Sequence, residues 1–408
     1  MIFMHGLFKM VNSVHLLDQV TQSSRSWDYL LILLACLTLF ALSVGTGPTS
    51  SMSVLLLVTW GLSGAWSKGW DWWWGQRQWL LPIFLLMLLP WVSLIWTISP
   101  EPGLYPYLHR SHFWLLSFVT ACLVFKNTKP EYLAYSFIAG VELVTVVFLF
   151  VTLGVISVEK LAVHFMWKGY ITYSLLLVVA TAFLSFGFRQ VRNNRYRCIL
   201  VAVMLMNLFA LALLKGRSGY LAFAALAPFM LVNLLGRQRW WVYLLAGLGL
   251  VGSLALSPTV QERVKLALHE VQSYQEEAVS QDTSIGNRLF LWQGATKVFQ
   301  EYPLLGAGID GYPVALQRQY PEQHSFHPNP HNFYLYMAAS YGLVGLSLYG
   351  WFLIALFRRA WPRRDRWQGF MLLTTLIMVM VASLTETTPL QPQTGILLAL
   401  MAGLPMGD

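Results

Sequence analysis

The sequence predicts an all-α polytopic membrane protein with about twelve transmembrane helices and one large helical loop. Three observations support this fold class. Apolar residues make up 56% of the 408 and charged residues 11%, whereas a soluble domain carries about 25% charged residues. Apolar runs recur at the length of a helical span, about 20 residues. No run shows the alternation of a barrel strand, so helices must satisfy the backbone polar groups. A soluble enzyme, a disordered chain and a secreted disulfide scaffold are excluded.

The apolar runs define the expected helices in chain order. They cover residues 27–45, 50–66, 79–97, 111–125, 131–155, 169–188, 198–214, 218–235, 241–257, 332–357, 368–384 and 388–404. The chain therefore divides into transmembrane helices at 1–257, a loop at 258–330 and the last transmembrane helices at 331–408.

The lysines and arginines predict the topology. When the connecting segments are assigned alternately to two sides, one side receives 17 of the 27 cations, and five of the remaining ten lie in the long loop. The positive-inside rule places the cation-rich side, with both termini, in the cytoplasm. The net charge of +9 is therefore a topology signal, and no nucleic-acid partner is expected.

The 73-residue segment 258–330 is too long for a simple connection and predicts an outer functional loop. Amphipathic helices are expected at 259–281 and 286–302, followed by a stop at Pro303 and a glycine-rich turn. The loop has eight acidic and five basic residues, so it is not a general polyanion binder. Any anion must be held by individual, placed cations.

Lys215 and Arg217 are two such cations on the otherwise cation-poor outer side, at the expected start of a helix. A helix N-terminus offers free N–H groups to an anion, and the flanking Gly216 and Gly219 would let the anion approach the backbone. The guanidinium adds a planar fork that suits phosphate oxygens. An interfacial anchor that reaches toward lipid headgroups is the alternative reading.

Arg288, His331 and Asn332 are further candidates on the same side. Arg288 begins an amphipathic segment, where a solvated or headgroup contact is the alternative. His331 begins a membrane helix, whose N-terminus disfavours an imidazolium and leaves a neutral ring that can accept a proton. It could therefore act as a general base. The Gly342-Leu343-Val344-Gly345 element that follows predicts a close helix contact in the bilayer.

The remaining ionisable residues carry weaker predictions. His324, His327 and Glu322 lie near His331, but no cysteine or clear carboxylate set accompanies them, so neither a metal nor another cofactor is expected. Glu142 lies inside a span and must be paired or functional. Glu386 could orient His331 or a basic group, although structural pairing is the simpler reading.

Together these motifs resemble the O-antigen ligase family. The family pattern of arginine, three residues and leucine matches Arg217 to Leu221, and its His-Asn, nine residues and Gly-x-x-Gly pattern matches His331 to Gly345. Arg288 with Trp292, the Pro-Leu-Leu-Gly-x-Gly run from Pro303, and a large loop between the ninth and tenth helices also agree.

The resemblance implies a GT-C-like, inverting, metal-independent glycosyltransferase in the inner membrane of a Gram-negative bacterium. It would transfer O-antigen from undecaprenyl pyrophosphate to lipid A–core on the periplasmic face. His331, Arg217 and Arg288 would be catalytic: His331 would activate the acceptor hydroxyl, and the arginines would hold the pyrophosphate. Lys215 and Asn332 would join Arg217 and Arg288 in substrate binding.

Other functions remain compatible with the sequence. O-antigen polymerases and protein O-oligosaccharyltransferases share the histidine motif and the loop, with a second glycan or a protein as the acceptor. A lipid-linked oligosaccharide transporter would carry charges along a midplane path, and the charges here gather at the predicted interfaces instead.

Overall fold

The computed structural model describes residues 23–102, 104–125, 129–156, 169–214, 216–236, 284–321 and 329–406, and the regular structure of these ranges is entirely helical. The helices are, in chain order, α2 (Ser23–Val44), α3 (Thr46–Ser63), α4 (Trp70–Gly75), α5 (Arg77–Val92), η2 (Ser93–Ile95), α6 (Leu104–Ala121), α7 (Glu131–Thr152), α9 (Tyr170–Gln190), α10 (Asn194–Leu213), α11 (Arg217–Leu235), α14 (Ser284–Glu301), α15 (Gly311–Gln319), α16 (Phe333–Ala360), η4 (Trp361–Arg363), α17 (Trp367–Ala382), η5 (Thr388–Leu390) and α18 (Pro392–Gly403).

The described helices confirm an all-helical, multi-pass membrane protein. Each predicted apolar segment within the described ranges forms a helix, and seven of these helices are long and apolar enough to cross a membrane. Helices α17 and α18 are apolar but shorter. The expected spans at 241–257 and the amphipathic segment at 259–281 lie outside the described residues, so the number of twelve stays a prediction.

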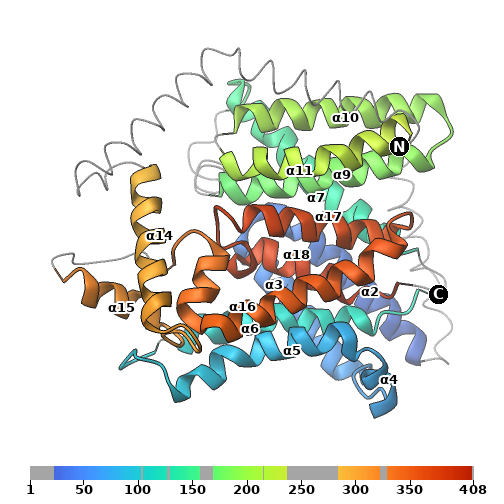
Figure 1. Ribbon diagram of the computed structural model, residues 1–408. Coiled ribbons are helices and arrows are strands. Elements are labelled where there is room, and N and C mark those ends of the chain that lie inside the picture. The colour runs from blue at the N-terminus through green and yellow to red at the C-terminus, as the bar shows by residue number, and fades with distance from the viewer. Residues whose placement is uncertain are drawn as a thin grey trace.

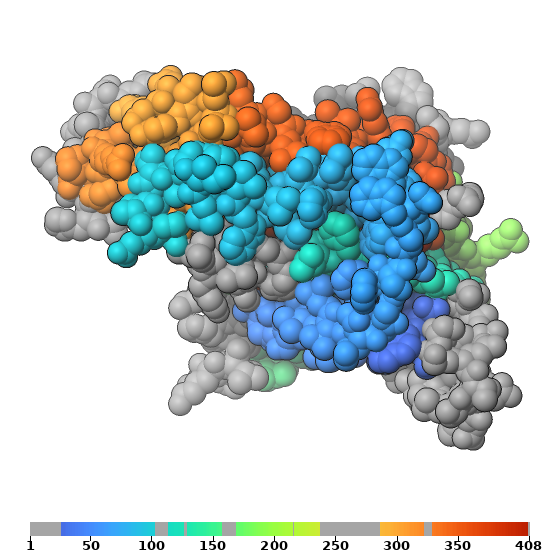
Figure 2. All heavy atoms as spheres, turned by 90° about the horizontal axis from the view of Figure 1, so that it is seen from below, coloured from blue at the N-terminus to red at the C-terminus, as the bar shows by residue number. Residues whose placement is uncertain are grey.

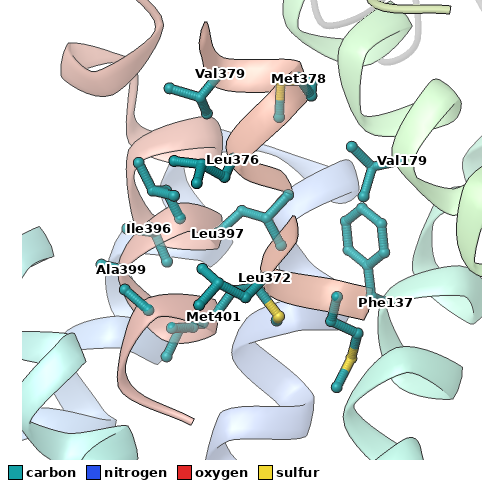
Figure 3. Close-up of a cluster of buried hydrophobic side chains, with 14 of the residues drawn as sticks. Phe137, Val179, Leu372, Leu376, Met378, Val379, Ile396, Leu397, Ala399 and Met401 are labelled. Atoms are coloured by element: carbon teal, nitrogen blue, oxygen red, sulfur yellow. The ribbon is translucent and has the colours of Figure 1, made fainter. Parts of the chain in front are cut away.

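The helices form a bundle in which α17 and α18 lie at the centre (Figure 1). Helices in a bilayer are surrounded by lipid rather than water, so their association gains nothing from moving apolar side chains out of water. Close packing of side chains holds such helices together instead. Figure 3 shows the close-packed centre, where α17 and α18 meet α7 and α9. The labelled core side chains are Phe137, Val179, Leu372, Leu376, Met378, Val379, Ile396, Leu397, Ala399 and Met401.

Contacts between distant segments define two ends of this bundle. At one end, the start of α16 meets the end of α17, because the Phe333 amide donates to the carbonyl of Ser383 at 2.8 Å. At the other end, the Arg189 guanidinium of α9 lies 2.7 Å from the Asp365 carboxylate that precedes α17. The first is called the His331 end, because His331 lies two residues before α16, and the second is called the Arg189 end.

Glu142, the acidic residue expected inside a span, is paired. Its Oε1 accepts a hydrogen bond of 2.8 Å from the Asn207 amide, which connects α7 to α10. The same amide lies 3.3 Å from the hydroxyl of Thr181 on α9. The three side chains therefore form a polar contact among three helices, in agreement with the expectation of structural pairing.

Helix α16 is broken at Gly342, which has φ 61° and ψ −155°. The break separates the amides of Leu343 and Val344 from the carbonyls of Ala339 and Ser340, their partners in a continuous helix. The turn after α14 restores all four groups. Pro303 and Leu304 carbonyls accept from the two amides at 2.9 and 3.2 Å, and the Ala307 and Gly308 amides donate to the two carbonyls, both at 2.9 Å.

This interlocking turn corrects the predicted role of the Gly-x-x-Gly element. Gly342 makes its close contact with the turn between α14 and α15, not with another membrane helix, because an added Cβ would overlap the Leu304 carbonyl oxygen. Helices α14 and α15 with this turn are called the outer segment below. Hydropathy could not reveal the break, since the residues on both sides of Gly342 are as apolar as those of a continuous span.

We expect Gly342→Ala to destabilise the protein, because only glycine adopts this backbone conformation without strain of about 1–3 kcal/mol. Gly350→Ala in the same helix is the matched control, since nothing lies within 4 Å of an added Cβ there. Thermal unfolding of the detergent-purified proteins should show a lower Tm for the first variant only. Equal Tm values would contradict the role of the break.

Candidate active site

The site is built around the carboxylate of Glu386, in the turn between α17 and η5 at the His331 end. Only 4% of its side chain is exposed. Oε1 accepts from the Arg288 guanidinium at 2.6 Å, and Oε2 lies 3.2 Å from Nδ1 of His331. A buried carboxylate is costly without such partners, so its burial requires the two side chains to meet it here.

Helix α14 brings Arg288 to this carboxylate, and it confirms the amphipathic helix predicted at 286–302. Its apolar face packs on α15, a helix the sequence analysis did not predict. The Tyr312 hydroxyl of α15 donates to the Leu291 carbonyl at 3.1 Å. Burial raises the pKa of this hydroxyl, which keeps it a neutral donor. Arg288 is thus carried by a folded unit.

The outer segment is also tied to the bundle at the end of α5. The Ile98 amide donates to the Ala307 carbonyl at 3.1 Å, and the Ile309 amide donates to the Ser93 hydroxyl at 3.0 Å. In Figure 2 the orange helices α14 and α15 accordingly lie against the cyan segment after α5. Together with the hydrogen bonds at the α16 break, these bonds hold α14 in position and so place the Arg288 side chain beside Glu386.

His331 has a left-handed backbone conformation with φ 50°. Such a conformation is strained for a non-glycine residue and persists where surrounding contacts impose it. Here the His331 amide donates to the Asn329 side-chain oxygen at 3.1 Å, and the same oxygen accepts from the Thr387 hydroxyl at 3.3 Å. Thr387 follows Glu386, so the histidine and the carboxylate are positioned together.

The contact between His331 and Glu386 bears on the tautomer of the histidine ring. An ionised carboxylate only accepts hydrogen bonds, so a hydrogen bond from His331 to an ionised Glu386 requires the proton on Nδ1. In the neutral ring the basic lone pair then belongs to Nε2. A carboxylate that orients a histidine in this way is a common arrangement for a general base.

Asn332 is buried and caps α16, where its side-chain oxygen accepts from the Leu335 amide at 3.1 Å. This is the usual role of asparagine at a helix N-terminus. The Asn332 side chain therefore stabilises the start of α16, and its expected role in substrate binding stays a prediction.

Arg217 is the first residue of α11, as predicted, and its side chain is exposed. The next residue anchors this helix end to the site, because the Ser218 and Thr385 hydroxyls are 2.8 Å apart and Thr385 precedes Glu386.

Gly216 and Gly219 were expected to let an anion approach the backbone, but the structure gives them a packing role. An added Cβ would lie 2.6 Å from the Ser174 hydroxyl at Gly216 and 2.5 Å from it at Gly219. They let α11 pack on α9. Lys215 lies outside the described residues.

The structure thus brings Arg288, His331 and Glu386 into direct contact, with Arg217 on an adjoining helix end. Sequence reasoning left Glu386 open between two roles, although its place before a proline-containing turn on the outer side was the available signal. Among the described residues no group of three His, Cys, Asp or Glu side chains could hold a metal ion. His324, His327 and Glu322 lie outside those residues.

Comparison with protein families identifies the class. Residues 201–350 match a family model described as O-antigen ligase. This range contains Arg217, Arg288, His331 and the Gly342 motif, so the match supports the assignment to the O-antigen ligase family that these motifs predict. The family indicates a membrane glycosyltransferase of the ligase or polymerase type. No curated protein matches the chain.

We expect Arg288→Ala to destabilise the fold by about 3 kcal/mol, because it leaves the buried Glu386 carboxylate without its cation. The double variant Arg288→Ala/Glu386→Gln should recover most of this loss, because the charge itself is removed. Thermal unfolding measures both.

The exposed pair of Arg189 and Asp365 is the control, with 46% and 62% of the two side chains accessible. Arg189→Ala should cost no more than about 1 kcal/mol. A double variant no more stable than Arg288→Ala would contradict the charge-based explanation.

Proposed function

We propose that the protein ligates O-antigen polysaccharide from undecaprenyl pyrophosphate onto lipid A–core, with inversion at the anomeric carbon and without a metal ion. One observation carries the proposal. A single buried carboxylate, Glu386, contacts both the histidine and one of the arginines of the family motifs. This arrangement suits a transfer that needs one base and stabilisation of a departing anion.

In the proposed reaction His331 accepts the proton of the acceptor sugar hydroxyl at Nε2, while Glu386 stabilises the imidazolium through Nδ1. The hydroxyl oxygen then attacks the anomeric carbon of the donor glycan from the face opposite the pyrophosphate. The new glycosidic bond forms as the bond to the pyrophosphate oxygen breaks. The electron pair leaves with undecaprenyl pyrophosphate, so a direct displacement inverts the anomeric centre.

Arg217 and Arg288 are proposed to bind the pyrophosphate and to stabilise the charge that grows on it. Arg288 uses Nη2 for Glu386, and a guanidinium has five N–H donors in all. Arg217 adds an exposed cation at a helix N-terminus, which favours an anion. Fixed cations of this kind lower a barrier most when they face charge that develops in the transition state.

The proposed location is the inner membrane of a Gram-negative bacterium, with both termini in the cytoplasm and the site facing the periplasm. The division of cations supports it. Arg217, Arg288 and His331 occur at one end of the bundle, while Arg189 and the arginines that end α16 occur at the other, where the positive-inside rule expects them.

A transporter is less consistent with the described residues. Midplane transport paths use ionisable side chains that face a cavity. Glu142 lies near the middle of α7 and is hydrogen-bonded to Asn207, whereas the ionisable side chains of the candidate site gather at the His331 end.

Deletion of the gene in its source organism tests the acceptor. We expect core lacking O-antigen and accumulation of lipid-linked polymer, restored by the wild-type gene and not by His331→Ala, whose membrane level serves as the control. Core capped by a single repeat would indicate a polymerase, and unchanged lipopolysaccharide would indicate a protein acceptor or transport; either result contradicts the ligase assignment.

Arg217→Ala should lower kcat/KM for the pyrophosphate-linked donor by about 100-fold in reconstituted membranes, because a charge-stabilising donor is lost. Arg192→Ala is the control, since Arg192 is an exposed cation in the connection that leads into α10. Unchanged kinetics for Arg217→Ala would contradict its proposed contact with the pyrophosphate.

A further inference from the structure

A polar cavity lies at the Arg189 end of the bundle, where α16 ends. Its volume is about 580 Å³, and it opens between α4, the start of α5, and the ends of α6, α16 and α18. Helix α16 begins beside His331, and its last residues, including Arg358 and Arg359, line this cavity. The cavity and the candidate active site therefore lie at opposite ends of α16.

Four cations line the cavity: Lys68, Arg358, Arg359 and Arg363. Its described lining contains no aspartate or glutamate. In the described part of the chain, Lys68, Arg358 and Arg359 make no ion pair, whereas Arg189 at the same end is paired with Asp365. Like charges that converge on one cavity repel, and an anion bound among them relieves that repulsion.

Arg359 is held in place rather than extended into water. Its guanidinium lies 3.6 Å from the centre of the Trp79 ring, and Nη2 donates to the Leu404 carbonyl at 2.7 Å. Its Nε is buried without a hydrogen-bond partner among the described residues. A topology signal needs only cations in loops. It does not need a fixed, half-buried guanidinium in a cavity with three other cations.

The surroundings indicate where the anion comes from. Trp72 lines the cavity, and Trp70 and Trp74 of the same short helix are 74% and 49% exposed. Exposed tryptophans gather at the depth of lipid headgroups, and basic pockets between membrane helices bind anionic headgroups. We propose that this cavity binds a phosphate group supplied by an anionic phospholipid, as a site separate from the glycan-transfer site.

Lipid binding to the purified full-length protein tests the proposal. Native mass spectrometry would compare added phosphatidylglycerol with phosphatidylcholine, for the wild type and for Lys68→Gln/Arg358→Gln. Both substituted side chains are exposed, so the fold should be kept, and Tm verifies it. The loss of two cations near a headgroup should weaken phosphatidylglycerol binding about thirtyfold.

Arg192→Gln/Arg195→Gln is the matched control, because it removes two exposed cations outside the cavity. Its affinity for phosphatidylglycerol should equal that of the wild type. Equal binding of the two lipids, or equal losses in both double variants, would overturn the proposal. Displacement of phosphatidylglycerol by millimolar inorganic phosphate at constant ionic strength would assign the cavity to a soluble phosphate and overturn the lipid source.

Discussion

The Glu386 carboxylate is the constraint on which the candidate site depends. It is almost fully buried, and each of its oxygens contacts a different partner, Arg288 and His331. The partners come from the outer segment and from the start of α16, so one side chain fixes the relation between them. Because the unpaired charge would be costly in this environment, the fold and the alignment of the histidine are stabilised by the same interaction.

The break in α16 supplies the second half of this arrangement. The four backbone groups released around Gly342 are all paired with the turn at residues 303–308. Unpaired backbone groups within a membrane protein cost several kcal/mol each, so the break and the turn require one another. The glycine-rich turn after Pro303 and the Gly342 motif are therefore parts of one hydrogen-bonded contact, and this contact holds α14 against the bundle.

The sequence predicted the membrane helices, which follow a repeated pattern of apolar runs. It did not predict features that depend on individual tertiary contacts. Apolar runs located the helices, because a bilayer imposes their length. Hydropathy did not reveal the break at Gly342 or helix α15, since the first depends on a partner distant in sequence and the second is short. Arg288 and His331 were found from their motifs, but their meeting at Glu386 follows only from tertiary packing. The functional roles of Arg217, Arg288 and His331, and those of Lys215 and Asn332, stay predictions.

The most direct test of the central claim is a double-mutant cycle of initial transfer rates in reconstituted membranes, with wild type, Glu386→Gln, His331→Ala and the double variant. If Glu386 acts through His331, Glu386→Gln should slow transfer by at least about tenfold in the wild type and have no further effect in His331→Ala. Equal, additive losses in both backgrounds would show that the two side chains act independently and would contradict the account.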